Sequence, residues 1–187
     1  MRKLSAFENI SLDGYFTDAG NDMSWAHAGN DDAEYQSFVS GNAQGGGILV
    51  FGRVTYDMMA SYWPSPLAKE RSPIVAQEMN ARTKYVASRT LKKADWANTA
   101  VLDDLVPAMR KLKNEDGPDM VILGSGAIVA QLAEAGLLDG LQVVVNPIAL
   151  GRGRTVFDGV SRRLNFTLGT SRTFKNGKVV LSYTPAG

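Results

Sequence analysis

Several features that mark common protein classes are missing from this chain of 187 residues. It has no cysteine, which excludes disulfides and thiol chemistry, and its single histidine, His27, argues against a zinc site. No apolar run approaches the ~18 residues of a membrane span. Twenty basic residues against 19 acidic ones leave a net charge of +1, so we expect neither nucleic acid nor an anionic membrane as a partner.

The remaining composition is that of a soluble globular protein, with 44% hydrophobic and 21% charged residues. The length suits a single domain over residues 1–187 with one sizeable core. The segment from Met1 to Glu8 has no apolar stretch of the signal-peptide kind, so we expect a cytoplasmic protein.

Apolar runs bounded by glycine, proline and polar residues predict strands that alternate with helices. The expected strands are Leu4–Ser11, Ile48–Phe51, Tyr85–Ala87, Thr99–Leu102, Met120–Leu123 and Leu141–Asn146. Two further strands, Asn165–Phe174 and Val179–Thr184, flank Lys175-Asn-Gly-Lys178, a strong hairpin signal. The pattern therefore predicts an α/β fold: a mostly parallel sheet with an antiparallel hairpin at one edge.

Helices are predicted where apolar residues recur at helical spacing. Asp31 and Glu34 form a capping-box pattern ahead of Tyr35, Phe38 and Val39. Other such stripes are Val54–Met58–Tyr62, Leu105–Met109–Leu112 and Ile128–Val129–Leu132–Ala135. The stretch 65–82 contains prolines and charges and gives no clear assignment.

Three predicted strands end abruptly in polar residues or glycine. The first runs into Gly52-Arg-Val-Thr55, the second into Ser88-Arg89, and the third into Gly124-Ser-Gly126. Ligands of α/β sheets bind at such strand ends, and arginines and glycine turns suit phosphate groups. Taken alone, each segment also allows a structural reading, in which Thr55 caps a helix and Arg53 and Ser88 are solvated.

The turn Gly124-Ser-Gly126 is only a weak match to the Rossmann dinucleotide fingerprint. The third glycine is missing, no acidic residue follows ~20 positions later, and the turn falls late in the chain. A Rossmann domain is therefore disfavoured.

These segments, together with Ser11-Leu-Asp-Gly14, resemble the dihydrofolate reductase-like superfamily, in its branch related to the reductase domain of riboflavin biosynthesis (RibD C-terminal domain). The resemblance covers nearly the whole chain. It implies a three-layer sandwich and NADPH as the cofactor. It assigns cofactor contacts to Ser11, Gly14, Gly52, Arg53, Val54, Thr55, Ser88, Arg89, Gly124, Ser125, Gly126, Ala127 and Ile128.

Within that set, the resemblance gives each segment a part of the cofactor. Arg53 and Thr55 would contact phosphates, and Ser88 with Arg89 would surround the ribose and its 2′-phosphate, which favours NADPH over NADH. The glycine turn would hold the pyrophosphate, where a bare backbone permits close approach. The segment Ser11–Gly14 would lie beside the nicotinamide.

Substrate and proton-transfer residues are predicted less directly. Trp25 matches a loop tryptophan near the substrate in the family, and Tyr56, Trp63 and Phe157 would complete an aromatic wall, although such residues usually form core. Asp13 and Asp31 are the predicted catalytic carboxylates, with Asp32 nearby and a protonated water as the alternative.

The predicted function is NADPH-dependent reduction of a pterin-, pyrimidine- or flavin-like ring, as in 5-amino-6-(5-phosphoribosylamino)uracil reductase. Two departures from that enzyme stand out. Phe7-Glu-Asn-Ile10 lacks the expected lysine, and Leu123-Gly-Ser-Gly126 replaces Glu-Gly-Gly. A non-catalytic NADPH-binding or sensing protein and a dihydrofolate reductase remain alternatives. Exposed sheet-edge strands near the C-terminus predict a homodimer.

Overall fold

A computed structural model describes residues 1–186, which build an eight-stranded sheet in the order β5-β4-β3-β6-β1-β7-β10-β9. The strands are β1 (Leu4–Ile10), β3 (Ile48–Gly52), β4 (Lys84–Ala87), β5 (Thr99–Leu102), β6 (Met120–Leu123), β7 (Gly140–Val145), β9 (Phe166–Thr173) and β10 (Val179–Pro185). The first six strands of this spatial order, β5, β4, β3, β6, β1 and β7, run parallel to one another. Strand β10 is antiparallel to both of its neighbours, β7 and β9. The predicted fold class is confirmed.

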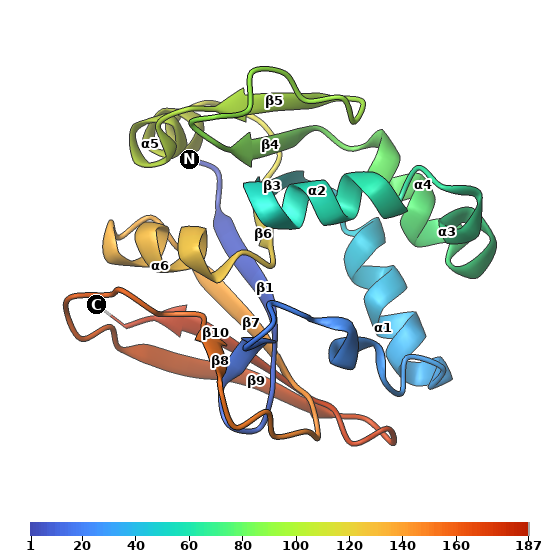
Figure 1. The fold of residues 1–187 in the computed structure, drawn as a ribbon. Coiled ribbons are helices and arrows are strands. Elements are labelled where there is room, and N and C mark those ends of the chain that lie inside the picture. The colour runs from blue at the N-terminus through green and yellow to red at the C-terminus, as the bar shows by residue number, and fades with distance from the viewer. Residues whose placement is uncertain (187) are drawn as a thin grey trace.

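A second, two-stranded sheet pairs β2 (Tyr15–Asp18) with β8 (Gly153–Thr155) in antiparallel fashion. In Figure 1 it lies close to the end of β1. The sequence pattern predicts neither strand, because each is short and lies within a polar loop.

Helices cover both faces of the main sheet (Figure 1). They are the short η1 (Ser24–His27), then α1 (Ala33–Gln44), α2 (Arg53–Tyr62), α3 (Pro66–Arg71), α4 (Pro73–Ala81), α5 (Leu105–Asn114) and α6 (Gly126–Glu134). Helices α5 and α6 pack on one face, and α1, α2 and α4 pack on the other. The molecule therefore has three layers.

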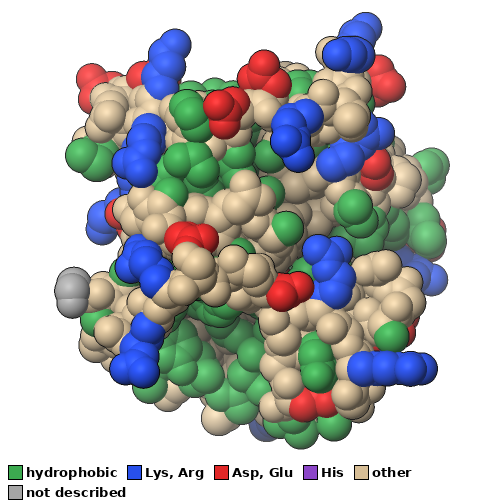
Figure 2. Space-filling view, turned by 60° about the vertical axis from the view of Figure 1, so that its left-hand side comes forward, with side chains coloured by type: hydrophobic (Ala, Val, Ile, Leu, Met, Phe, Trp, Pro, Cys, Tyr) green, Lys and Arg blue, Asp and Glu red, His purple; other side chains and the backbone are tan. Residues whose placement is uncertain are grey.

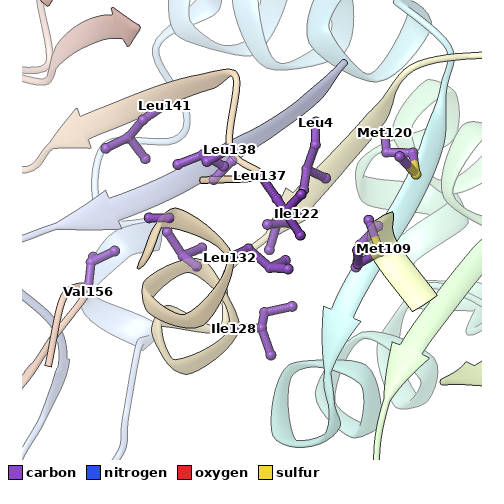
Figure 3. Close-up of a cluster of buried hydrophobic side chains, with 14 of the residues drawn as sticks. Leu4, Met109, Met120, Ile122, Ile128, Leu132, Leu137, Leu138, Leu141 and Val156 are labelled. Carbon is purple, nitrogen blue, oxygen red and sulfur yellow. The ribbon is translucent and has the colours of Figure 1, made fainter. Parts of the chain in front are cut away.

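The main core lies between the sheet and the pair α5 and α6. Figure 3 shows Leu4 and Ile122 from adjacent parallel strands against Ile128 and Leu132 of α6. All four are fully or almost fully buried, and Met109 of α5 closes the same cluster. The predicted stripes of α5 and α6 therefore face the sheet as expected.

Two local predictions differ from the structure, and one stretch without an assignment is helical. Asp32, not Asp31, is the N-cap of α1, and its carboxylate accepts a hydrogen bond from the Tyr35 N–H at 2.8 Å. In α2 the apolar stripe is misplaced: Val54 is 75% exposed, whereas Thr55 and Tyr56 are buried. The unassigned stretch 65–82 forms α3 and α4.

The surface carries charges of both signs. On the face shown in Figure 2, basic and acidic side chains both occur, and several basic ones lie along the left-hand side. Within residues 1–186, every helix is too short or too polar to cross a bilayer.

Candidate functional site

Two adjacent parallel strands, β3 and β6, each run directly into a helix at the same edge of the sheet. Helix α2 begins at Arg53 after Gly52, and α6 begins at Gly126 after Ser125. Neither helix start is capped by a side-chain hydrogen bond from its N-cap residue. The first N–H groups of both helices are therefore available to an anion, which the positive end of each helix dipole also attracts.

The hydroxyl of Ser125 joins these two turns. Ser125 Oγ accepts a hydrogen bond from the Gly52 N–H at 2.8 Å and donates one to Thr55 Oγ1 at 2.6 Å. Ser125 itself adopts a left-handed conformation with φ 71°, which is unfavourable for a residue other than glycine. Its side chain points toward the neighbouring turn, so the serine's contribution to a ligand would come from its backbone.

Packing around the turns requires glycine at two of the predicted positions. A Cβ on Gly52 would lie 2.8 Å from Ser125 Oγ, and a Cβ on Gly126 would lie 2.7 Å from the Phe16 ring. Gly126 has no positive φ, so contact with Phe16, rather than backbone conformation, constrains this residue. Substituting Gly126 would disturb the core as well as any bound pyrophosphate.

The predicted arginines lie at the ends of neighbouring strands, since β3 pairs with β4. Arg53 Nε is 2.7 Å from the Asp57 carboxylate one helical turn away, which leaves its terminal nitrogens to solvent. Arg89 is exposed. Ser88 Oγ accepts hydrogen bonds from the N–H groups of Thr90 and Leu91, so this hydroxyl shapes the turn that presents Arg89.

The Ser11–Gly14 turn is held by its own hydrogen bonds. Ser11 is fully buried, and its Oγ donates to Asp13 Oδ1 at 2.6 Å. The Asp13 carboxylate also accepts from the N–H groups of Leu150 and Gly151. These hydrogen bonds, that from Ser11 foremost, lower the pKa of Asp13 to about 2. Such a carboxylate stays ionised at neutral pH, which argues against Asp13 as the proton donor.

A cavity of about 530 Å³ opens on the α1 side of the sheet. Phe7 and Asn9 of β1 form part of its floor, and Met59 and Trp63 of α2 form part of one wall. Gly124 reaches the same cavity, and its N–H donates to the Phe7 carbonyl at 3.2 Å. The cavity therefore adjoins the glycine turn at the carboxyl ends of the strands.

Of the four aromatic residues predicted to contact the substrate, only Trp63 lines this cavity. Tyr56 is buried beside Trp96, whose backbone N–H donates a hydrogen bond to the Tyr56 hydroxyl oxygen at 3.1 Å. Phe157 packs on Phe166 on the opposite face of the sheet. Trp25 donates its ring N–H to the Asp22 carbonyl. Asp31 is exposed in the loop before α1 and does not line the cavity either.

Sequence analysis did not single out Glu8 as a functional candidate. It is fully buried on β1, and neither carboxylate oxygen has a hydrogen-bond partner within residues 1–186. Burial raises its pKa to about 8, so the carboxyl is mostly protonated at neutral pH. Strand alternation places Glu8 with Leu4 and Ala6 on the α6 side, away from the cavity. The signal in the sequence that could have identified Glu8 is its position as a charged residue within an otherwise mostly apolar strand.

The sheet order, the uncapped helix starts and the adjoining cavity define a dihydrofolate reductase-like α/β protein. The family described as the RibD C-terminal domain matches residues 2–180. The chain belongs to this family, and the predicted resemblance is confirmed.

Three relatives illustrate the match. The uncharacterized protein YyaP of Bacillus subtilis (strain 168) is 25% identical over 178 residues, which cover 93% of this chain and 90% of YyaP. A putative riboflavin biosynthesis protein from Shewanella sp. PV-4 superposes with a TM-score of 0.75 at 21% identity, over 99% of each chain. The Thermotoga maritima diaminohydroxyphosphoribosylaminopyrimidine deaminase/5-amino-6-(5-phosphoribosylamino)uracil reductase gives 0.71 at 15% identity, over 99% of this chain and 57% of that one.

Proposed function

We propose that the protein is an NADPH-dependent reductase of a small heteroaromatic substrate of pterin, pyrimidine or flavin type. The observation that carries the proposal is that, at the carboxyl ends of the strands, two uncapped helix starts lie beside one end of a large cavity. The family match and the reductase names of similar structures support it.

The residues at the strand ends suit a cofactor with several phosphates. Backbone N–H groups at the start of α6 and the guanidinium of Arg53 would hold the pyrophosphate. Arg89, exposed beside the turn made by Ser88, would bind the 2′-phosphate that distinguishes NADPH from NADH. When bound, the cofactor would supply hydride.

The cavity provides the surroundings that hydride transfer favours. Phe7, Met59, Trp63 and Leu123 belong to its lining, and such apolar side chains limit access of water. Asp119 lies at the opposite, amino end of the strands. With Asp13 held ionised by its hydrogen bonds, we assign proton delivery to a water molecule at the cavity mouth.

The cavity also bears on the choice of substrate. Of the segment Phe7–Ile10, Phe7 and Asn9 line the cavity, whereas Glu8 is buried on the other face. A cation that could pair with a phosphorylated tail is therefore missing from this segment, and the cationic lining residue Arg82 lies at the amino ends of the strands, away from the glycine turn. We expect little turnover of the ribosylated pyrimidine of riboflavin synthesis and better turnover of an uncharged flat ring.

Two assays test the proposal and separate it from a non-catalytic NADPH-binding role. Calorimetric titration should show tighter binding of NADPH than of NADH. Steady-state assays with dihydropterin, pyrimidine and flavin-like acceptors should then show NADPH consumption that depends on the acceptor. Equal affinity for both cofactors would contradict the cofactor assignment. Selective NADPH binding without turnover of any acceptor would favour a sensing protein.

A further inference from the structure

Asn9 occupies a chemically distinct position at the carboxyl end of the cavity. It lies near the end of β1, pairs with Val144 of β7 and lines the cavity. The adjacent residue on the same face, Phe7, bonds through its carbonyl to the N–H of Gly124 in the glycine turn. Asn9 is therefore a polar group of the cavity lining on the side of the glycine turn, close to where the cofactor would deliver hydride.

The orientation of the Asn9 amide follows from its partner, Asn146. Asn146 is only 2% exposed, and its Nδ2 lies 3.2 Å from the Ile10 carbonyl and 3.1 Å from the Val144 carbonyl. Backbone carbonyls only accept hydrogen bonds, so the atom facing them must be the nitrogen. The orientation of the Asn146 amide is thus determined by the backbone.

The same Asn146 Nδ2 lies 3.2 Å from Asn9 Oδ1. Asn146 Nδ2 shares its two hydrogens among these three acceptors. Because two NH2 groups would repel, the oxygen of Asn9 faces Asn146, and the NH2 group of Asn9 remains as the free end. Within the part of the chain that is described, Asn9 Nδ2 donates no hydrogen bond and is not enclosed by protein. Asn9 therefore presents a fixed donor to the cavity.

We propose that Asn9 is a substrate-binding residue whose NH2 group donates a hydrogen bond to a carbonyl oxygen on the substrate ring. The inference rests on the proposed function and narrows its substrate class to oxo-substituted rings of the lactam type, as opposed to amino-substituted ones. An amino group at that position would set two donors against each other inside the cavity, where an unmade hydrogen bond is costly.

The test compares two ligands that differ at one ring position, 2-amino-4-oxopteridine and 2,4-diaminopteridine. Calorimetry of the full chain with saturating NADPH should show at least about tenfold tighter binding of the oxo compound. In Asn9→Asp, one carboxylate oxygen can still accept from Asn146 while the other faces the cavity as an acceptor, so the preference should reverse. Asn9→Ala should bind both ligands with similar affinity.

Asn42→Asp is the matched control, because Asn42 lines the same cavity but its Nδ2 donates to Gln142, which pairs with Phe7 and not with Asn9. Its ligand preference should equal that of the wild type. Equal wild-type affinities, failure to bind either pteridine, or an unchanged preference in Asn9→Asp would each overturn the inference. A different result is that the wild type prefers the oxo compound, Asn9→Ala loses that preference, and neither protein binds NADPH. This result would support Asn9 as a substrate-binding residue and refute the proposed cofactor.

Discussion

Replacing Glu8 with glutamine should stabilise the protein increasingly as the pH rises. The carboxyl is fully buried and lacks hydrogen-bond partners within residues 1–186, and burial raises its pKa from 4.5 to about 8. Between these two pH values the folded protein binds a proton that the unfolded chain has released. As far as Glu8 is concerned, the free energy of unfolding of the wild-type protein is therefore highest below pH 4.5 and falls as the pH rises toward 8.

The size of the effect follows from the two pKa values. In this range each pH unit lowers the free energy of unfolding by about 1.36 kcal/mol. The loss is therefore about 3 kcal/mol at pH 7 and about 5 kcal/mol once the pH reaches about 8. Glutamine keeps the shape and removes the ionisation. Its amide would gain no partner in this site, but the protonated carboxyl has none either, so the two side chains should be close in stability at low pH. The advantage of Glu8→Gln should therefore be small at pH 5 and clear at pH 8.

Urea denaturation at several pH values between 5 and 8 measures this difference directly. Asp13→Asn is the control, because hydrogen bonds lower the pKa of Asp13 to about 2. That contribution to stability is present above the unfolded pKa of 3.8 and is lost only as the pH falls toward 2, so Asp13→Asn should show no trend between pH 5 and 8. A constant difference between wild type and Glu8→Gln across this range would refute the reasoning.

Three further predictions concern the cofactor site and the assembly. Ser125→Gly should leave the free energy of unfolding within about 1 kcal/mol of the wild-type value, because relief of the left-handed conformation offsets the lost hydrogen bonds. It should nevertheless weaken NADPH binding about tenfold, because the hydrogen bonds that join the two turns are lost. Unchanged NADPH affinity would show that these hydrogen bonds do not position the turns for the cofactor. Arg89→Ala should cost about 1.5–3 kcal/mol of NADPH affinity and little NADH affinity, and calorimetry with both cofactors decides this. We also propose a homodimer through the sheet edge, because β9 is an edge strand that is exposed along nearly all its length; light scattering that gives the 20.2 kDa monomer at micromolar concentration would exclude it.

Sequence patterns predicted most of the sheet because its strands are buried apolar runs. The run Ile48–Phe51 lies in β3, which is buried along its whole length, and the Asn176-Gly177 turn joins β9 to β10 as expected. Helices α3 and α4 have no counterpart among the predicted helices, because their stretch contains prolines and charges and gave no clear assignment. Pro66 and Pro73 each stand at the start of a helix, where the fixed φ of proline is favourable and its missing N–H costs nothing.

The candidate site was predictable where it depends on backbone turns and less so where it depends on side-chain direction. Glycine and arginine at strand ends indicated the turns after β3 and β6. Alternation along β1 implies that Glu8 and Asn9 point to opposite faces, but only the packing of α1 and α6 shows which face holds the cavity. Tyr56 and Phe157 could equally have been core or cavity wall, and tertiary packing places both in the core.

The most direct test of the central claim follows hydride from the cofactor to the substrate. Purified protein would be supplied with NADPH carrying deuterium at the transferable position and with an oxo-substituted dihydropterin, and the product would be analysed by mass spectrometry. A reductase predicts one deuterium in each product molecule, together with equal consumption of NADPH. If pterin, pyrimidine and flavin-like acceptors all gave no deuterated product, and NADPH consumption did not exceed that without protein, the assignment as a reductase would be contradicted.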